Sequence, residues 1–229
     1  MLRGPPDGTP LLIVPALFEE MNRTRRLLAL VGAALALAGV RSWMPDLPGT
    51  GDHEDKLDTA TPDRWRAALT ALADIAGGGR EIDVIAVRGG ALIAPVARVR
   101  SLCRVAPPTD GANIWRSLLR ARVAGAGETG DGATIATLEA ASRAGEAVNT
   151  MGYRVPAALA EGLRLATLAA PPCRIRTVST APGADIDAVL PGPPPWLTSE
   201  PDDVAPLAAA LAADWLARSG PATRPPHGP

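Results

Sequence analysis

The stretch IDVIAVRGGALIAPVA, residues 82–97, decides the fold because it predicts a buried strand, a glycine turn and the beginning of a helix. The run IDVIAV is mostly apolar, which is typical of a strand covered on both faces of a parallel sheet. Arg88 stands at the tip of the turn, next to Gly89 and Gly90. The two glycines lack the side chains that would keep a ligand away from the backbone amides.

Short apolar strands alternate with helices on both sides of this stretch. Thr61, followed by Pro62, has the pattern of a helix N-cap with proline at the first helical position. The alternation predicts a mostly parallel sheet of about six strands with helices on both faces. Ligands of such sheets bind beyond the carboxyl ends of the strands. Besides 82–87, the predicted strands lie in residues 9–16, 40–44, 101–107 and 173–180. ADIDAVLP, residues 184–191, is a candidate last strand, and a closing helix lies in 203–219.

Residues 110–168 interrupt this alternation. They predict three helices, in ANIWRSLLRARVAG, ATIATLEAASRAG and PAALAEGLRLATLAA, with a strand only around EAVNTMGYRV. An insertion between strands is expected to lie over the strand ends as a cap. We therefore expect a single domain over residues 1–219 that includes this cap, followed by a flexible proline-rich tail at 220–229.

The composition limits the classes of partner that we expect for this protein. The chain has 229 residues, is 47% hydrophobic and carries a net charge of -1. Without clustered positive charge, we expect no nucleic acid as a partner. The apolar run 27–40 is too short to span a bilayer and predicts a buried helix, so we expect no membrane span. Cys103 and Cys173 lie in apolar runs, which favours core thiols in a reducing, cytoplasmic protein over disulfides or a metal site.

Several segments together resemble one family. PALFEEMNRTRR, WMPDLPGTGD, AVRGGALIA and the run to PGPPPWLTSE are similar to the α/β-hydrolase-fold family named exosortase A system-associated hydrolase 2, over roughly residues 10–218. The resemblance implies an α/β-hydrolase-like fold, a mostly parallel sheet with helices on both faces and a helical cap insertion. It also implies a turn of the form G-x-R-x-G and, as candidate partners, proteins of the exopolysaccharide and exosortase system.

The sequence departs from the family's pattern at three positions. Ala86 replaces the first glycine of the turn, Gly89 precedes the last one, and His53 stands where a serine commonly follows the GD dipeptide. These departures concern the shape of the pocket, and the fold implied by the resemblance does not depend on them.

The residues argue against a conventional serine hydrolase. In α/β-hydrolases the strand–turn–helix element carries the nucleophile in G-x-S-x-G. Here that place holds Arg88, which is permanently cationic and cannot attack a carbonyl. The chain has only two histidines, His53 after the second long strand and His227 in the tail. The segment PPPWLTSE stands where the catalytic histidine is expected, so the sequence predicts that the Ser-His-Asp triad is absent.

Arg88 has two interpretations. A guanidinium fork beside Gly89, at the positive end of a helix, predicts a seat for a carboxylate or phosphate. Alternatively Arg88 pairs internally with Glu19, Glu20 or Glu200, because a buried arginine without a carboxylate partner is costly. The two interpretations are compatible if the carboxylates orient the guanidinium.

The remaining candidates are weaker. Glu20, Asp52 and His53 are candidate bases for a water-based hydrolysis with Arg88 as an electrophilic clamp. Trp196 is expected at the rim of the pocket, where it replaces the histidine segment. We expect no metal and no cofactor. Two functions stay open: a non-catalytic protein that binds an anionic small molecule, and a hydrolase of an ester-like substrate with a non-standard mechanism.

Overall fold

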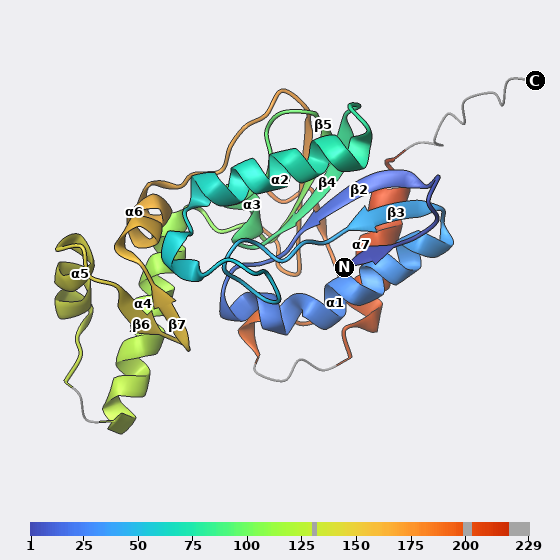
Figure 1. The fold of residues 1–229 in the computed structure, drawn as a ribbon. Coiled ribbons are helices and arrows are strands. Elements are labelled where there is room, and N and C mark those ends of the chain that lie inside the picture. The colour runs from blue at the N-terminus through green and yellow to red at the C-terminus, as the bar shows by residue number, and fades with distance from the viewer. Residues whose placement is uncertain (130–131, 199–202, 220–229) are drawn as a thin grey trace, which may run out of the picture.

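The computed structural model describes residues 1–129, 132–198 and 203–219. Its centre is a seven-stranded sheet in the order β1-β3-β2-β4-β5-β8-β9 (Figure 1). All neighbouring strands pair in parallel except β1, which pairs antiparallel with β3. The strands are β1 (Leu2–Arg3), β2 (Thr9–Val14), β3 (Val40–Trp43), β4 (Ile82–Val87), β5 (Val99–Val105), β8 (Arg174–Ser179) and β9 (Ala188–Val189). The mostly parallel sheet predicted from the sequence is confirmed, with β1 as an unpredicted addition.

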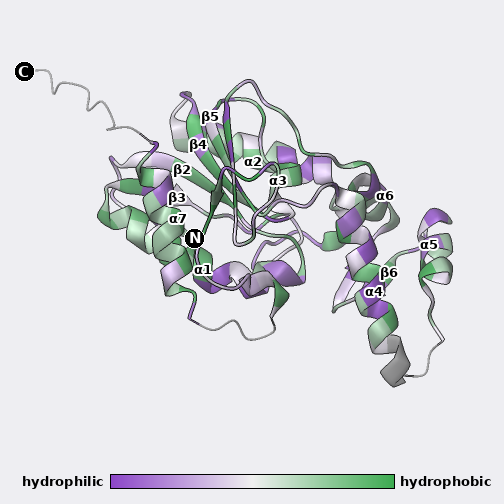
Figure 2. Ribbon diagram, turned by 180° about the vertical axis from the view of Figure 1, so that it is seen from behind, coloured by the Kyte–Doolittle hydropathy of each residue, from purple (hydrophilic) through white to green (hydrophobic). Residues whose placement is uncertain are grey.

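Two pairs of helices cover the sheet. On one face lie α1 (Glu19–Leu37) and α7 (Ala205–Leu216), and on the other lie α2 (Pro62–Gly77) and the short α3 (Gly90–Ile93). Every residue of β4 is buried, as its mostly apolar sequence predicts for a central strand. Figure 2 shows the central strands as the most hydrophobic part of the chain.

Local signals explain the bounds of α2. The Thr61 side chain accepts a hydrogen bond from the backbone N–H of Arg64 at 3.1 Å, and Pro62 occupies the first helical position, as predicted. Gly78 ends the helix with a φ of 56°, a left-handed conformation that glycine adopts without a Cβ penalty.

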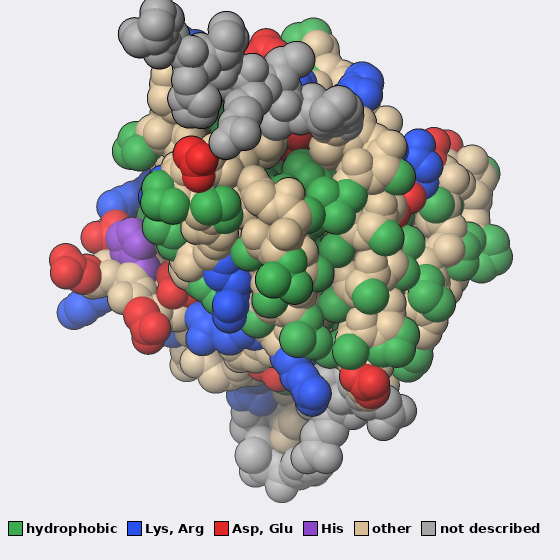
Figure 3. Space-filling model, turned by 90° about the vertical axis from the view of Figure 1, so that its right-hand side faces the viewer, with side chains coloured by type: hydrophobic (Ala, Val, Ile, Leu, Met, Phe, Trp, Pro, Cys, Tyr) green, Lys and Arg blue, Asp and Glu red, His purple; other side chains and the backbone are tan. Residues whose placement is uncertain are grey.

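Residues 27–37 of the apolar run predicted as a buried helix form the second half of α1, and Val40 at the end of the run begins β3. Leu27, Leu28, Val31 and Leu35 are buried, but Leu37 is 93% exposed. The helix is thus buried along one side only. The face of the molecule at the right of Figure 1, where α1 ends, is broadly apolar (Figure 3). Within the described residues no helix is long and apolar enough to cross a membrane.

The predicted cap region contains three helices and a hairpin beyond the carboxyl ends of the strands (Figure 1). These are α4 (Gly111–Thr129), α5 (Ile135–Arg143), β6 (Val148–Thr150), β7 (Tyr153–Val155) and α6 (Ala157–Leu165). The strand expected around EAVNTMGYRV is a hairpin that turns at Met151 and Gly152, both with positive φ.

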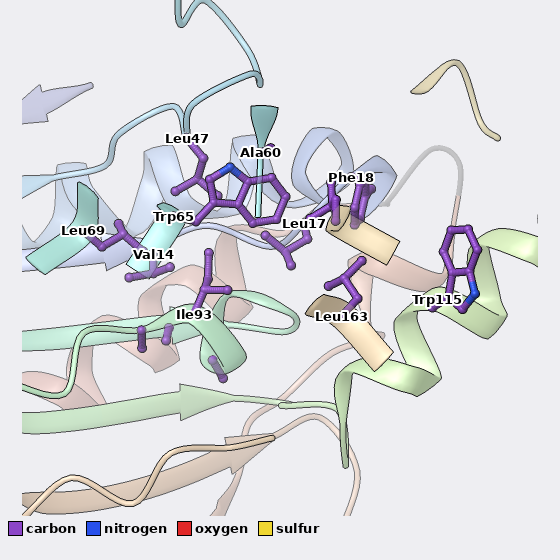
Figure 4. Close-up of a cluster of buried hydrophobic side chains, with 14 of the residues drawn as sticks. Val14, Leu17, Phe18, Leu47, Ala60, Trp65, Leu69, Ile93, Trp115 and Leu163 are labelled. Carbon is purple, nitrogen blue, oxygen red and sulfur yellow. The ribbon is translucent and has the colours of Figure 1, made fainter. Parts of the chain in front are cut away.

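One continuous apolar cluster joins the cap to the sheet. It runs from Leu69 and Trp65 of α2 through Phe18 to Trp115 of α4 (Figure 4). Phe18 makes edge contacts with two rings, Trp65 at 6.2 Å and Tyr153 at 5.5 Å between centroids. The cap is therefore packed onto the sheet through the loop after β2.

Candidate functional site

The turn after β4 has the strained geometry of a nucleophile elbow, with arginine in the nucleophile's place. Arg88 has a φ of 51°, which is uncommon for a residue other than glycine. Its backbone N–H donates to the carbonyl of Val105 at 2.9 Å, and its carbonyl accepts from Ala91. A Cβ at Gly90 would lie 2.3 Å from the carbonyl oxygen of Pro15, so only glycine lets the turn pack against β2.

The Arg88 side chain is held by two partners. Its Nε lies 3.2 Å from both carboxylate oxygens of Glu20, and its Nη2 donates to Glu20 Oε1 at 2.9 Å. Its Nη1 donates to the carbonyl of Ala106 at 2.7 Å. These contacts engage Nε and one N–H on each Nη, which leaves two of the five guanidinium N–H donors without a partner among the described residues.

Trp196 covers this ion pair. The Arg88 guanidinium carbon lies 5.3 Å from the centroid of the Trp196 ring, a cation–π arrangement. The Trp196 carbonyl in turn accepts a hydrogen bond from Arg23 Nη1 at 3.2 Å. Arg23 also pairs with Glu19 at 3.5 Å, one helical turn earlier. This hydrogen bond thus links Trp196 to the first turns of α1, next to the elbow.

These groups line a pocket of about 220 Å³ at the carboxyl end of the sheet, between α1 and α4. Among the described residues the charges of this pocket balance, because Arg23 and Arg88 face Glu19 and Glu20. Asn113 and Ser117 of α4 add neutral polar groups. The rest of the lining is apolar: Leu17, Phe18, Pro108, Ile114, Leu118, Ala121, Met151 and Trp196. The volume lies below the usual range for drug-sized ligands, so the pocket suits a small molecule.

The loop after β2 forms the second strained turn of the site. Phe18 has a φ of 55° at the start of α1, and this loop supplies the second oxyanion-hole amide in α/β-hydrolases. Tyr153 stands close by, and burial together with the nearby Glu19 carboxylate raises its pKa. Tyr153 comes from a segment that the sequence did not mark as part of a site, whereas Phe18 directly precedes the predicted site residue Glu19.

The structure brings some of the sequence-predicted site residues together and leaves others apart. Arg88, Glu19, Glu20 and Trp196 come together in the pocket. Gly89 lies at the elbow outside the lining, and a Cβ there would meet the side chains of Leu17 and Ile114.

Asp52 and His53 lie in an exposed loop after β3, and neither lines the pocket. The His53 Nδ1 accepts the backbone N–H of Asp55 at 3.1 Å. Glu200 and His227 fall outside the described residues. Within the described residues no group of three or more His, Cys, Asp or Glu side chains is placed to hold a metal ion.

Sequence reasoning missed Arg23, Asn113 and Ser117. Arg23 follows Glu19 by four residues, a spacing that places both on one side of a helix and could have been noticed. Asn113 and Ser117 carried no signal, because their place in the pocket depends on how the cap packs.

The fold and the elbow define an α/β-hydrolase-fold protein, and comparison with solved structures agrees. The sequence itself matches no protein-family model and no curated protein. The alpha/beta hydrolase domain-containing protein 10 from mouse superposes with a TM-score of 0.60 at 14% identity, over 95% of this chain and 92% of that one. A thermophilic esterase from Thermogutta terrifontis gives 0.57 at 14% identity over 95% and 92%. Est1E from Butyrivibrio proteoclasticus, with ferulic acid bound, gives 0.55 at 18% over 78% and 72%.

These similarities establish the α/β-hydrolase fold. At such low identity they say nothing about substrate or chemistry. The exosortase-associated family is named by none of the comparisons and stays a prediction.

Proposed function

We propose that this chain is a ligand-binding protein on an α/β-hydrolase scaffold, that it lacks a Ser-His-Asp triad, and that it binds an anionic small molecule at Arg88. The observation that carries the proposal is the Arg88 guanidinium in the nucleophile's place at the base of the pocket, fixed by Glu20 and the Ala106 carbonyl. A group held in this way is oriented before a ligand arrives, which lowers the entropic cost of binding.

The ligand's charge follows from the donors that remain. Two N–H groups of Arg88 are left within the described part of the chain, and a planar guanidinium matches a carboxylate or phosphate. Glu19 and Glu20 do not exclude an anion, because Arg23 and Arg88 balance their charges. The apolar wall around Ile114 and Trp196 favours a ligand with an apolar part beside its anionic group.

A second candidate is hydrolysis of an ester-like substrate by an activated water. The observation in its favour is that the Glu20 carboxylate lines the same pocket as Arg88, so a base and an electrophilic clamp lie side by side. Asp52 and His53 do not line the pocket, so Glu20 alone carries this candidate. Turnover of a carboxylic ester that is lost in Glu20→Gln, with ligand binding retained, would favour hydrolysis over binding.

Thermal-shift screening of carboxylates and phosphate esters tests the main proposal, with wild type and Arg88→Met compared. Arg66→Met is a matched control, since Arg66 also bridges a carboxylate, Asp63 at 2.7 Å, and a carbonyl, Leu92 at 2.9 Å. An anion that stabilises wild type and Arg66→Met but not Arg88→Met supports the proposal. A carboxylate-induced shift that survives in Arg88→Met contradicts it.

The biological setting is proposed from the sequence resemblance. Its motif segments support a cytoplasmic role beside the exopolysaccharide and exosortase system, with proteins of that system as partners. The two cysteines are free, Cys103 buried and Cys173 partly buried, which is compatible with a reducing compartment. Co-purification of tagged protein from a cell that carries such a gene cluster tests this setting, and recovery with unrelated proteins alone would contradict it.

A further inference from the structure

A second and larger pocket, of about 600 Å³, lies near the amino ends of β5 and β8. The strands are parallel, so this pocket and the Arg88 pocket lie at opposite ends of the sheet. Its floor is formed by residues 101–103 of β5 and 174–176 of β8, and its wall by the last turn of α7 and the residues that follow it, up to Ser219. Its volume falls within the range of sites for drug-sized ligands.

Strand register places two arginines on the same face of the sheet. Ser101 pairs with Arg174 and Cys103 pairs with Arg176. Alternate residues of a strand share a face, and Cys103 belongs to the apolar cluster under α1 and α7. Arg174 and Arg176 therefore stand on the α7 side, where Arg218, two residues after the end of α7, is a third arginine.

Asp214 holds the Arg176 side chain in position. Arg176 Nε and Nη2 donate to the two Asp214 carboxylate oxygens at 2.8 and 2.6 Å, and both side chains are less than one fifth exposed, at 18% and 14%. Burial opposes ionisation of Asp214, but hydrogen bonds from Arg176 and the charge of Arg218 outweigh it and lower its pKa. The pair is therefore charged, and the remaining Arg176 donors are held in place.

The other charges leave a positive excess. Arg218 Nε lies 3.6 Å from the same Asp214 oxygen, so one carboxylate serves two arginines. Asp187 uses one carboxylate oxygen to accept the backbone N–H of Thr177 at 2.7 Å. In the part of the chain that the structure describes, the Arg174 guanidinium has no carboxylate partner. Three arginines thus face two aspartates.

We propose that this pocket binds a soluble small molecule through a phosphate group, held by Arg174, Arg176 and Arg218. Arginine forks match the oxygens of a phosphate, and a guanidinium held by a carboxylate loses little freedom on binding. Trp215, which also lines the pocket, supplies an apolar wall for the rest of the ligand. The site is independent of the function proposed at Arg88, because the two pockets share no residue.

Isothermal titration calorimetry with phenyl phosphate and inorganic pyrophosphate tests the proposal. The decisive variant is Arg174→Gln combined with Arg218→Gln, two changes on the pocket wall that leave the Arg176–Asp214 pair intact. We expect binding to weaken about tenfold or more, since charge-assisted hydrogen bonds are lost. Arg98→Gln combined with Arg143→Gln removes the same charge from side chains that are 53% and 71% exposed, outside both pockets.

The expected pattern is specific. The control pair retains wild-type affinity, while the Arg174 and Arg218 double variant loses it. The same comparison in an Arg88→Met background removes any contribution of the elbow to phosphate binding. Equal weakening in the control pair would reduce the effect to general charge and overturn the site. Loss of binding in Arg88→Met alone would place the phosphate at the elbow instead. Binding to phosphatidylcholine vesicles that contain phosphatidic acid, without binding of soluble phosphates, would also overturn the proposal.

Discussion

Replacing Arg88 with methionine measures how strongly the elbow depends on its ion pair. The change removes the contacts to Glu20 at 2.9 and 3.2 Å and the bond to the Ala106 carbonyl at 2.7 Å. Methionine retains most of the apolar stem beneath Trp196. The main loss is therefore electrostatic, and Glu20 is left without its partner.

The contacts and exposure of the ion pair determine how much stability the Arg88→Met change should cost. Hydrogen bonds to charged groups contribute roughly 1.5–3 kcal/mol each when buried. The Arg88 and Glu20 side chains are 23% and 29% exposed, so solvent reduces their interaction. We expect Arg88→Met to lower the free energy of unfolding by about 2–3 kcal/mol. The corresponding fall in Tm is about 5–10 °C for a domain of this size.

A double-mutant cycle isolates the pair from the rest of the substitution. Urea unfolding of wild type, Arg88→Met, Glu20→Met and the double variant, followed by far-UV circular dichroism, gives the coupling free energy. We expect about 1–2 kcal/mol, with the double variant more stable than the sum of the two changes, because an apolar pair replaces an ion pair without an orphaned charge.

The Arg66 and Asp63 pair gives the comparison. Asp63 is 91% exposed, so the same cycle there should yield a coupling near zero, roughly 0–0.5 kcal/mol. A coupling at Arg88 as small as that value would refute the reasoning that Glu20 holds the guanidinium in place.

Three further predictions concern the catalytic machinery, acid stability and packing. A fluorophosphonate should label no serine and p-nitrophenyl acetate should not be turned over, whereas stoichiometric labelling would restore a serine mechanism. Asp214 has a lowered pKa in the folded state, so its stabilising contribution is present above the unfolded value of about 3.9 and lost as pH falls below it. Urea midpoints of wild type and Asp214→Asn should accordingly converge in acid. Gly90→Ala should cost about 2–3 kcal/mol, because its Cβ would lie 2.3 Å from the Pro15 carbonyl oxygen, and an unchanged midpoint would contradict this.

The sheet was predictable from the sequence because its signals are local. Apolar runs bounded by glycine and proline predicted β2, β3, β4, β5 and β8, and the Thr61–Pro62 pair predicted the start of α2. Strand β1 was missed because two residues carry no periodic pattern, and its pairing with β3 is a tertiary event.

The sequence predicted some residues of the site, but not the cap residues that join them in the pocket. Arg88, Glu20 and Trp196 were identified from their places relative to strands, and the pocket joins them across long separations in sequence. Asn113 and Ser117 reach the same pocket from the cap, and no local pattern records how a cap packs on a sheet. The acidic loop with Asp52 and His53 looked chemically rich, but it lies outside the pocket lining.

The backbone at the elbow adds a constraint on what Arg88 does. A φ of 51° at a residue other than glycine costs free energy, of order 1 kcal/mol, which glycine in its place would avoid. The contacts of the Arg88 side chain with Glu20 and Ala106 offset more than this amount by the magnitudes worked above. The side-chain contacts of Arg88 therefore stabilise the turn in which its backbone is strained. The elbow and the ion pair form one unit, and a ligand that binds the remaining guanidinium donors meets a group already held in position.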